Sequence, residues 1–237
     1  MIVMKYIATA LLSGAIMMCA AACSSDKKAE DNAQQPAETS DPNGLPVYDI
    51  PFSATSTLGK TDKKVLVLSA SPRRGGNTDM LCDEFVRGAR EAGGDVEKIF
   101  LDDYKIDFFH EEHTTAPDTV VTPGDQAPMI IQKMVDADII VLSSPVYYMN
   151  IDGQLKTLMD RCYRNAGMKG KEFYYITACA DSDPATAETA IFAFRGFVVC
   201  LPQPTERGSV KAIGLGRKGE VDGSAYLSEA YELGKTI

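Results

Sequence analysis

The sequence lacks an excess of basic side chains: its 237 residues include 24 Lys and Arg against 33 Asp and Glu, a formal net charge of -9. Nucleic-acid binding is driven largely by basic groups that displace counterions from the phosphate backbone. The acidic balance therefore argues against a nucleic-acid partner. The sequence also has no Trp, but its 45% hydrophobic and 24% charged residues form an ordinary globular composition, which excludes global disorder.

A long hydrophobic run is missing near the start of the chain. The apolar stretch 6–22 is shorter than the roughly 20 apolar residues of a membrane-spanning helix. It ends in small residues directly before Cys23, which resembles the lipobox of bacterial lipoproteins, although Ala20 stands where Leu is usual. We therefore expect a signal peptide over residues 1–22 and a lipidated Cys23, and hence an exported, membrane-anchored lipoprotein of a bacterial cell envelope. An uncleaved anchor and a plain secretory signal are alternative interpretations.

Residues 23–63 are expected to form a flexible tether and linker. Between residues 24 and 44 the chain is polar and has almost no large apolar side chains, so it cannot bury a core. The short apolar patch 47–52 is a candidate for docking on the domain surface, with no role that the sequence indicates. We place the folded domain at residues 64–237.

In the domain, short apolar runs alternate with segments of helical period, as in a parallel sheet with crossover helices. The expected strands are 65–68, 96–101, 139–142, 173–177 and 209–214, and the expected helices are 77–92, 125–136, 152–163, 184–199 and 223–233. Right-handed crossovers favour an α/β flavodoxin-like three-layer sandwich, with a five-stranded parallel sheet in the order 2-1-3-4-5. In that order ligands lie beyond the carboxyl ends of the strands. The loops after Leu68, Leu142 and Thr177 are therefore the candidate site.

The first loop, residues 69–78, follows a buried strand and opens a helix, so its backbone N–H groups and the helix dipole suit an anion. It offers hydroxyls, an amide, a permanent charge and tight-turn glycines from Ser71, Thr78, Asn77, Arg73, Gly75 and Gly76. A glycine-rich turn with an N-cap at Asn77 or Thr78 would explain the same residues. The loop has neither the triphosphatase nor the dinucleotide glycine pattern, which favours a phosphate monoester.

Three ordered motifs carry a family resemblance. They are Ser71-Pro72-Arg73-Arg74-Gly75-Gly76-Asn77-Thr78, Ser144-Pro145-Val146-Tyr147-Tyr148 and Gly153-Gln154-Leu155-Lys156 with Asp160-Arg161. Together they resemble the NADPH-dependent FMN reductase-like branch of the flavodoxin superfamily, to which the iron-sulfur flavoproteins also belong. The resemblance covers residues 64–234. It implies a non-covalent FMN whose phosphate is held by Ser71, Arg73, Asn77 and Thr78, with Gly76 in the same loop.

The second and third loops suit a flavin ring. Pro145 is expected to turn the chain out of its strand, so that the N–H groups after it, from Val146 onward, reach the polar edge of the ring. Tyr147 and Tyr148 offer flat apolar faces, and the resemblance implies that Tyr147 and its neighbours contact the ring. At least one of the two tyrosines is expected instead to cap the core or a dimer interface. Ala178, in the third loop, is small enough for the ring to approach.

The stretch 107–121 departs from the iron-sulfur members, which carry clustered cysteines there. This chain has none in that stretch, so we expect no iron-sulfur cluster. It has instead His110 and His113 with two glutamates between them. A divalent-metal site is one interpretation, but we favour a solvated loop or a wall of the flavin pocket and expect no metal. Either imidazole could also donate protons to a nearby flavin.

The cysteines of the domain are Cys82, Cys162, Cys179 and Cys200. In an oxidising compartment they could pair in three ways. The topology places Cys82 and Cys162 on opposite faces of the sheet, so we expect buried free thiols. Cys179 has no base beside it in the sequence, and we interpret it as a packing residue.

The resemblance implies an FMN-dependent oxidoreductase that takes hydride from NAD(P)H and reduces a small-molecule acceptor, with no catalytic residue identified. An exported protein would not meet the cytosolic nicotinamide pool, so a quinol or another redox protein is an alternative donor. A non-catalytic electron carrier and a surface interaction module that has lost its flavin are alternative functions. Members of the family often dimerise, which makes a homodimer a further expectation.

Overall fold

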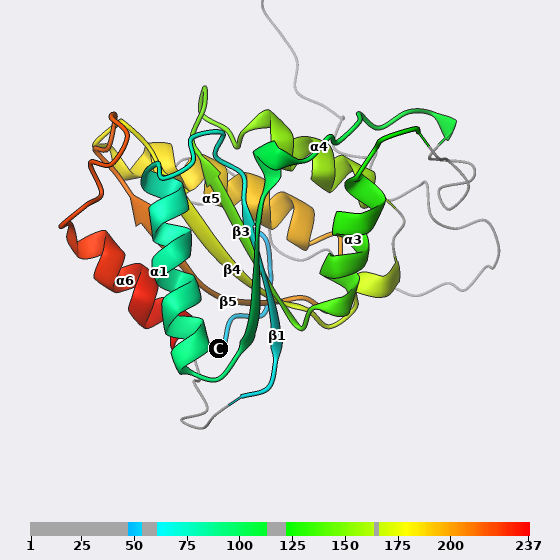
Figure 1. The fold of residues 1–237 in the computed structure, drawn as a ribbon, viewed down its shortest axis with the longest axis horizontal. Helices are drawn as coiled ribbons and strands as arrows, with labels where there is room; N and C mark the ends of the chain where they lie inside the picture. Colours follow the sequence, from blue (N-terminus) through cyan, green and yellow to red (C-terminus); the bar gives the residue numbers. More distant parts are fainter. Residues whose placement is uncertain (1–46, 54–60, 113–121, 164–165) are drawn as a thin grey trace, which may run out of the picture. The chain divides into compact units, whose positions relative to one another are not determined.

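The computed structural model describes residues 47–53, 61–112, 122–163 and 166–237. The described chain contains one parallel sheet of five strands in the order β2-β1-β3-β4-β5 (Figure 1). The strands are β1 (Lys64–Ser69), β2 (Asp95–Phe100), β3 (Ile139–Pro145), β4 (Glu172–Ala178) and β5 (Thr205–Ala212). This confirms the predicted fold class and strand order.

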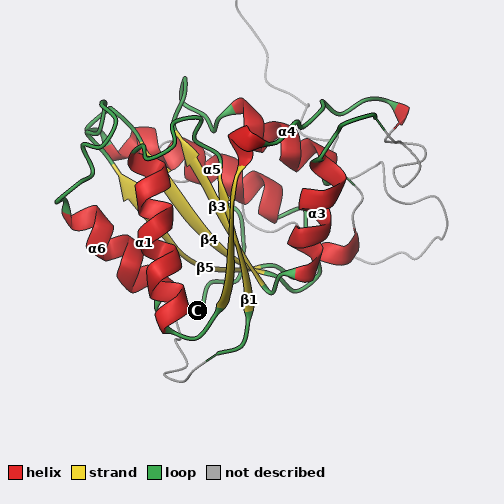
Figure 2. Ribbon diagram, in the orientation of Figure 1, coloured by secondary structure: helices red, strands yellow, loops and turns green. Residues whose placement is uncertain are grey.

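Helices cover both faces of the sheet (Figures 1 and 2). On one face lie α1 (Asn77–Glu91) and α6 (Ala225–Gly234), and on the other lie α3 (Ala127–Asp136), α4 (Gly153–Arg161) and α5 (Pro184–Val198). Two single 3-10 turns, η1 (Leu101–Asp103) and η2 (Ala166–Met168), join these elements. The result is the three-layer sandwich expected from the alternating pattern.

Strand β1 explains why its apolar run is continuous. Val65 and Val67 lie in the core beneath α1 and α6, whereas Leu66 and Leu68 lie in the core beneath α3, α4 and α5. All four are at most 2% exposed. A strand buried on both faces needs apolar side chains at every position, and each such burial stabilises the fold by about 1.5–3 kcal/mol.

Helices α1 and α6 approach each other backbone to backbone. A Cβ atom at Gly88 would lie 2.1 Å from the carbonyl oxygen of Tyr231, and one at Gly234 would lie 2.2 Å from the carbonyl oxygen of Phe85. No side chain fits at either position without moving a helix. The contact places α6, and the loop before it, against α1.

The apolar patch before the domain lies along the free edge of β5. Phe52 forms a parallel bridge with Glu206, whose N–H donates to the carbonyl of Pro51 at 2.8 Å. Tyr48 stacks on Phe192 of α5 with ring centroids 5.3 Å apart. The segment covers part of an edge strand that would otherwise offer unpaired backbone groups.

Three strand boundaries differ from the prediction by two or more residues. Strand β5 begins at Thr205, four residues before the predicted start, because Glu206 is buried with its carboxylate bound by both Arg195 Nε (2.9 Å) and Nη2 (2.6 Å). It ends at Ala212 because the chain turns at Gly214, where φ is +73°. Strand β3 continues through Pro145, which matters for the site below.

Candidate functional site

The three loops chosen from the sequence start side by side at the carboxyl end of the sheet. The N–H of Ala70 donates to the carbonyl of Ser143 at 3.1 Å, and the N–H of Val146 donates to the carbonyl of Ala178 at 3.0 Å. These bonds link the ends of β1, β3 and β4, which are neighbours in the sheet. The residues predicted from separate stretches of sequence therefore belong to one end of the domain, where ligands of doubly wound sheets bind.

The β1–α1 loop presents the open start of a helix. Gly76 is the N-cap of α1, and no side chain in the described chain caps the helix there. The N–H of Gly76 donates to the carbonyl of Arg73 at 2.7 Å, and Gly75 has φ +66°, a conformation that favours glycine. The tight turn leaves the N–H groups of the first helical turn for an anion.

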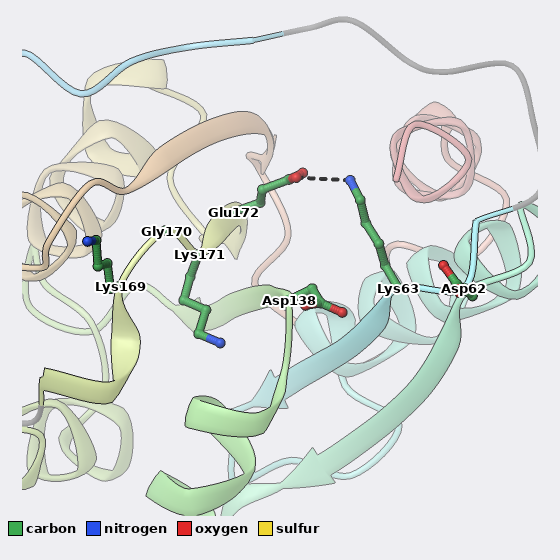
Figure 3. A pocket seen from close by; sticks show the side chains of 7 residues that line it. All are labelled: Asp62, Lys63, Asp138, Lys169, Gly170, Lys171 and Glu172. Atoms are coloured by element: carbon green, nitrogen blue, oxygen red, sulfur yellow. Dashed lines mark hydrogen bonds and ion pairs between the residues drawn. The ribbon is translucent and has the colours of Figure 1, made fainter.

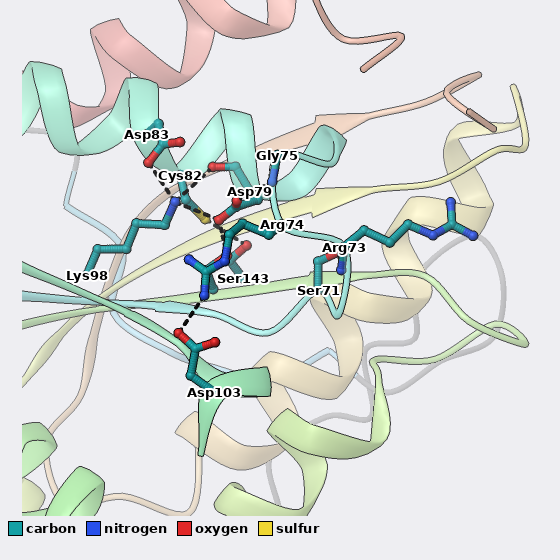
Figure 4. A network of polar contacts seen from close by, with 11 residues as sticks. Ser71, Arg73, Arg74, Gly75, Asp79, Cys82, Asp83, Lys98, Asp103 and Ser143 are labelled. Atoms are coloured by element: carbon teal, nitrogen blue, oxygen red, sulfur yellow. Dashed lines mark hydrogen bonds and ion pairs between the residues drawn. The ribbon is translucent and has the colours of Figure 1, made fainter. Parts of the chain in front are cut away.

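The hydroxyl residues of this loop are buried, while its first arginine is exposed. Ser71 is 3% exposed and Thr78 is 2% exposed, and Ser71 Oγ accepts the N–H of Arg73 at 3.2 Å. The guanidinium of Arg73 extends away from the buried polar groups (Figure 4). Direct phosphate contacts by Ser71, Arg73 and Thr78 stay predictions.

Asn77 has a structural role that the sequence did not reveal: it holds the β5–α6 loop through hydrogen bonds to the backbone. Its Nδ2 donates to the carbonyls of Leu215 (3.2 Å) and Arg217 (2.8 Å), and its Oδ1 accepts the N–H of Val221 at 3.2 Å. These bonds tie the β5–α6 loop to the start of α1. The amide thus has partners within the protein, and its predicted contact with a phosphate stays untested.

Asp79 is the main site residue that the sequence analysis missed. Its carboxylate is buried below the loop and accepts Ser69 Oγ at 2.8 Å, the N–H of Gly75 at 2.7 Å and Lys98 Nζ at 2.6 Å. Burial alone would raise the pKa of Asp79, but the bonds from Lys98, Gly75 and Ser69 outweigh it and hold the pKa below its usual value. An acid in the first turn of a helix was the available sequence signal.

Two further polar contacts lie near this loop, one from the loop itself and one between α1 and β3 (Figure 4). Arg74 pairs with Asp103 and lies over the ring of Phe100 at 4.1 Å. Cys82 Sγ lies 3.0 Å from Ser143 Oγ, and burial raises the pKa of this thiol to about 11. Cys82 is therefore a neutral packing group at physiological pH.

The four domain cysteines are free, as predicted. Cys82 lies in the core beneath α1 and Cys162 in the core on the other side of the sheet. Burial raises the pKa of Cys162 to about 12, and burial also raises the pKa of Cys179. The expectation of burial is wrong for Cys200, which is exposed just after the end of α5.

The β3–α4 loop corrects the prediction for Pro145. The chain does not leave the strand there, because Pro145 still pairs with Ala178 of β4. The missing N–H is tolerated because β1, on the other side, has already ended at Ser69 opposite Ser143. The N–H of Val146 is bound to Ala178 within the sheet, so it is not directed at a ligand.

The tip of this loop is a tight, strained turn. Tyr147 and Asn150 exchange backbone bonds of 2.8 and 3.1 Å, and the residues between them, Tyr148 and Met149, have φ of +50° and +60°. Positive φ at both central positions defines the mirror-image turns in which Asn and Gly are the usual residues. Tyr148 is fully exposed, and Tyr147 is 36% exposed. Both rings are accessible to a ligand, and their predicted flavin contacts stay predictions.

Asp152 is a second buried acid that the sequence did not reveal. It is the N-cap of α4 and is 1% exposed; Oδ1 accepts the N–H of Leu155 at 3.0 Å, and its own N–H donates to Ser144 Oγ at 2.8 Å. Its Oδ2 finds no hydrogen-bond partner in the described chain. Burial raises the pKa of Asp152 to about 7, with a smaller contribution from Asp102.

Both ends of the histidine-containing stretch are attached to α4. Arg161 pairs with Asp125 at 2.6 Å and donates to the carbonyl of Asp107 at 3.0 Å; its side chain is only 4% exposed. His110 is exposed, and His113 lies outside the described residues. Within the described ranges no group of three or more His, Cys, Asp or Glu side chains is arranged to hold a metal ion.

A charged hollow lies at the other end of the sheet, near the amino ends of β1, β3 and β4 (Figure 3). Its lining residues are Asp62, Lys63, Asp138, Lys169, Gly170, Lys171 and Glu172. Lys63 pairs with Glu172 at 2.9 Å, and Lys171 Nζ donates to two backbone carbonyls at the end of α3. These three charges bind one another or the backbone, so they give no argument for a ligand in the hollow.

Two curated relatives match part of the chain. An iron-sulfur flavoprotein of Methanocaldococcus jannaschii is 37% identical over 41% of this chain and 51% of its own length. An iron-sulfur flavoprotein of Archaeoglobus fulgidus is 29% identical over 41% of this chain and 44% of its own length. The chain therefore spans about half the length of these relatives.

The fold has close counterparts among solved structures. An NAD(P)H:quinone oxidoreductase from Methanothermobacter marburgensis matches with a TM-score of 0.57 and 16% identity over 74% of this chain and 96% of its own. An azoreductase from Bacillus anthracis matches with a TM-score of 0.56 and 15% identity over 74% of this chain and 100% of its own. These likenesses establish the flavodoxin-like fold. The model of the NADPH-dependent FMN reductase family matches residues 63–203, and the chain belongs to that family.

Proposed function

We propose that this protein is an FMN-dependent oxidoreductase that takes electrons from NAD(P)H and reduces a small-molecule acceptor such as a quinone. One observation carries the proposal. The uncapped start of α1 follows the inner strand β1 and lies beside the carboxyl ends of β3 and β4, in a chain of the FMN reductase family. A phosphate at this helix start would place the rest of the nucleotide along the sheet end.

The residues present fit a flavin nucleotide. The buried hydroxyls of Ser71 and Thr78 and the helix N-terminus form a polar cradle, in which a side chain at Gly76 would approach the carbonyl of Arg73 at 2.7 Å. The exposed rings of Tyr147 and Tyr148 stand on the neighbouring loop. Bound FMN supplies the two-electron redox chemistry. The protein binds the phosphate, orients the ring and holds it at the end of the sheet.

The supporting contacts keep this cradle in shape before a ligand arrives. Asp79 holds the N–H of Gly75, and Lys98 compensates the buried charge of Asp79. On the opposite side of the sheet, Asp152 caps α4 and joins it to Ser144. Groups fixed in this way bind without a large reorganisation on ligand entry, which favours affinity.

We infer further that the protein works without an iron-sulfur cluster. The names of the two relatives given above mention such a cluster, but residues 107–121 contain no cysteine to bind one. Electrons would therefore pass directly between the flavin and the donor or acceptor. An iron determination on the purified protein tests this inference, and stoichiometric iron with sulfide would contradict it.

The location of the protein is also a proposal. The apolar stretch before Cys23 supports export and lipid anchoring in a bacterial cell envelope, and these residues lie outside the described part of the structure. Within the described residues no helix is long and apolar enough to cross a membrane. Mass spectrometry of the protein from its native membrane fraction should detect a diacylglyceryl group on Cys23. A protein that still begins at Met1 would contradict cleavage before Cys23.

If the protein is exported, the identity of its electron donor has to be determined by experiment. A cytosolic nicotinamide would not reach an exported enzyme, so a quinol or a redox protein is the alternative donor. The absorption spectrum of the purified full-length chain, followed by anaerobic titration with NADPH and with a quinol, separates these possibilities. Flavin bands that bleach with either donor, with steady-state reduction of a quinone, support an oxidoreductase.

Other outcomes favour the two alternative functions. Bleaching without turnover would indicate an electron carrier. A colourless protein that does not bind added FMN would contradict the proposal and favour an interaction module without flavin. Size-exclusion chromatography with light scattering measures in the same preparation whether the chain forms the homodimer expected from its resemblance to the family.

A further inference from the structure

The β5–α6 loop is held against the predicted phosphate site. Asn77, the first residue of α1, bonds to the carbonyls of Leu215 and Arg217 and to the N–H of Val221. Leu215 also donates its N–H to the carbonyl of Cys179, at the end of β4, at 2.8 Å. The loop, which contains the sequence Gly216-Arg217-Lys218-Gly219, is therefore fixed between two of the three site loops.

This loop places the side chain of Lys218 beside Gly75. A Cβ atom built on Gly75 would lie 3.8 Å from Lys218 Cε and 4.0 Å from its Nζ. Gly75 is the residue before the N-cap of α1, so the ammonium group lies next to the open helix start. The side chain is exposed, and no ion pair joins it to any acid of the described ranges.

The other cations around the loop are already paired. Arg74 is bound by Asp103, and Lys98 is bound by Asp79 and Asp83. A phosphate monoester carries close to two negative charges at neutral pH and is bound more tightly by cations that are not neutralised elsewhere. Arg217 lies 3.9 Å from Glu220, so among the residues that the structure describes Arg73 and Lys218 are the two cations at this loop without an ion pair.

We propose that Lys218 binds the phosphate of the flavin nucleotide and that Asn77 positions it through the β5–α6 loop. This rests on the proposed function, since the ligand is FMN at the same site. Lysine is an effective phosphate ligand as a compact point charge on a flexible stem, which suits a position at the rim of the loop. Asn77 is then a positioning residue, whose effect on FMN passes through Lys218.

The test compares FMN with riboflavin, which lacks the phosphate. We expect Lys218→Ala to raise the dissociation constant of FMN roughly tenfold to a hundredfold, the usual effect of losing a bond to a charged group, and to leave riboflavin binding unchanged. Lys218→Arg should retain most of the affinity. Lys169→Ala is the matched control, because it removes an exposed lysine at the opposite end of the sheet and changes the net charge equally.

A second variant tests the positioning role. Asn77→Leu should weaken FMN binding, and the double variant with Lys218→Ala should be no weaker than the worse single variant, because both act on one contact. Additive losses would overturn the positioning role of Asn77. A Lys218→Ala variant that binds FMN as the wild type does, or that loses riboflavin and FMN equally, would overturn the proposal for Lys218. If the wild type binds no FMN, both the proposed function and the proposal for Lys218 are wrong.

Discussion

The carboxylate of Asp79 accepts the backbone N–H of Gly75 at 2.7 Å, four residues before it in the chain. The same carboxylate binds Lys98, which comes from the neighbouring strand β2. The glycine turn of the β1–α1 loop is thereby attached to the sheet by a buried ion pair. A glycine-rich loop acquires a fixed shape in this way, at the cost of a charge buried near the proposed phosphate site.

Asp79→Asn should destabilise the domain by about 2–3 kcal/mol at neutral pH, because Lys98 loses a buried partner. The folded-state pKa of Asp79 is lowered, so its stabilisation is present above the pKa of the unfolded chain, near pH 4, and is lost as the pH falls further. The difference between wild type and variant should therefore shrink in acid.

Urea unfolding at pH 7 and pH 3 measures this difference. Asp83→Asn is the control, since Asp83 binds the same lysine with a side chain that is 61% exposed, and it should cost less than about 1 kcal/mol. Equal losses in the two variants would contradict a special role for Asp79.

Asp152 should give the protein the opposite pH dependence. Its folded-state pKa of about 7 lies above the value in the unfolded chain, so folding favours the protonated form. Stability should fall as the pH rises from about 4 to about 7 and then level off. Asp152→Asn keeps a capping oxygen without the charge, and should be more stable than the wild type at pH 8 by up to about 3 kcal/mol.

Thermal unfolding between pH 4 and pH 8 tests this prediction. Asp183→Asn is the matched variant, because Asp183 caps α5 through the N–H of Ala185 but is exposed. It should change the pH profile little. A wild-type stability that does not decline between pH 5 and pH 7, or an unchanged decline in Asp152→Asn, would contradict the assignment.

Gly88 and the carbonyl of Tyr231 are too close for any side chain between them. Gly88→Ala should therefore separate α1 from α6 and destabilise the domain by about 2–3 kcal/mol, despite the higher helix propensity of alanine. Gly153→Ala serves as the control, because a Cβ atom at this first position of α4 meets nothing within 4 Å. Chemical denaturation should show the first variant weakened and the second neutral or slightly stabilised.

The sequence predicted the parts of this protein that depend on local pattern. Continuous apolar runs such as 65–68 identified inner strands, and the chain order of strands and helices left one favoured topology. The position of Ser71 at the end of the first strand then followed, since the carboxyl ends of parallel strands share one edge. No long-range information was needed for these steps.

The missed features depend on contacts between distant residues. The sequence did not show that Asn77 ties two loops together, because its partners, from Leu215 to Val221, lie about 140 positions away in the chain. In the sequence, Asp79 is an ordinary acid in the first turn of a helix. Only the structure shows that Lys98, from β2, pairs with it. Pro145 was expected to end its strand, because the sequence does not show that the neighbouring strand has already ended at Ser69.

The Tyr148 side chain should lower the stability of the domain but strengthen the binding of FMN. Its φ of +50° is strained for an aromatic residue, and its ring is fully exposed. Tyr148→Gly should relieve the strain and stabilise the domain by roughly 0.5–1 kcal/mol, while weakening FMN binding through loss of the ring. Gln203→Gly, at another position with positive φ (+53°) in the turn before β5, should give a similar stability gain with unchanged FMN affinity. Urea unfolding and flavin fluorescence titration of both variants separate the two effects. If Tyr148→Gly binds FMN as tightly as the wild type, the predicted contact between the Tyr148 ring and the flavin is wrong.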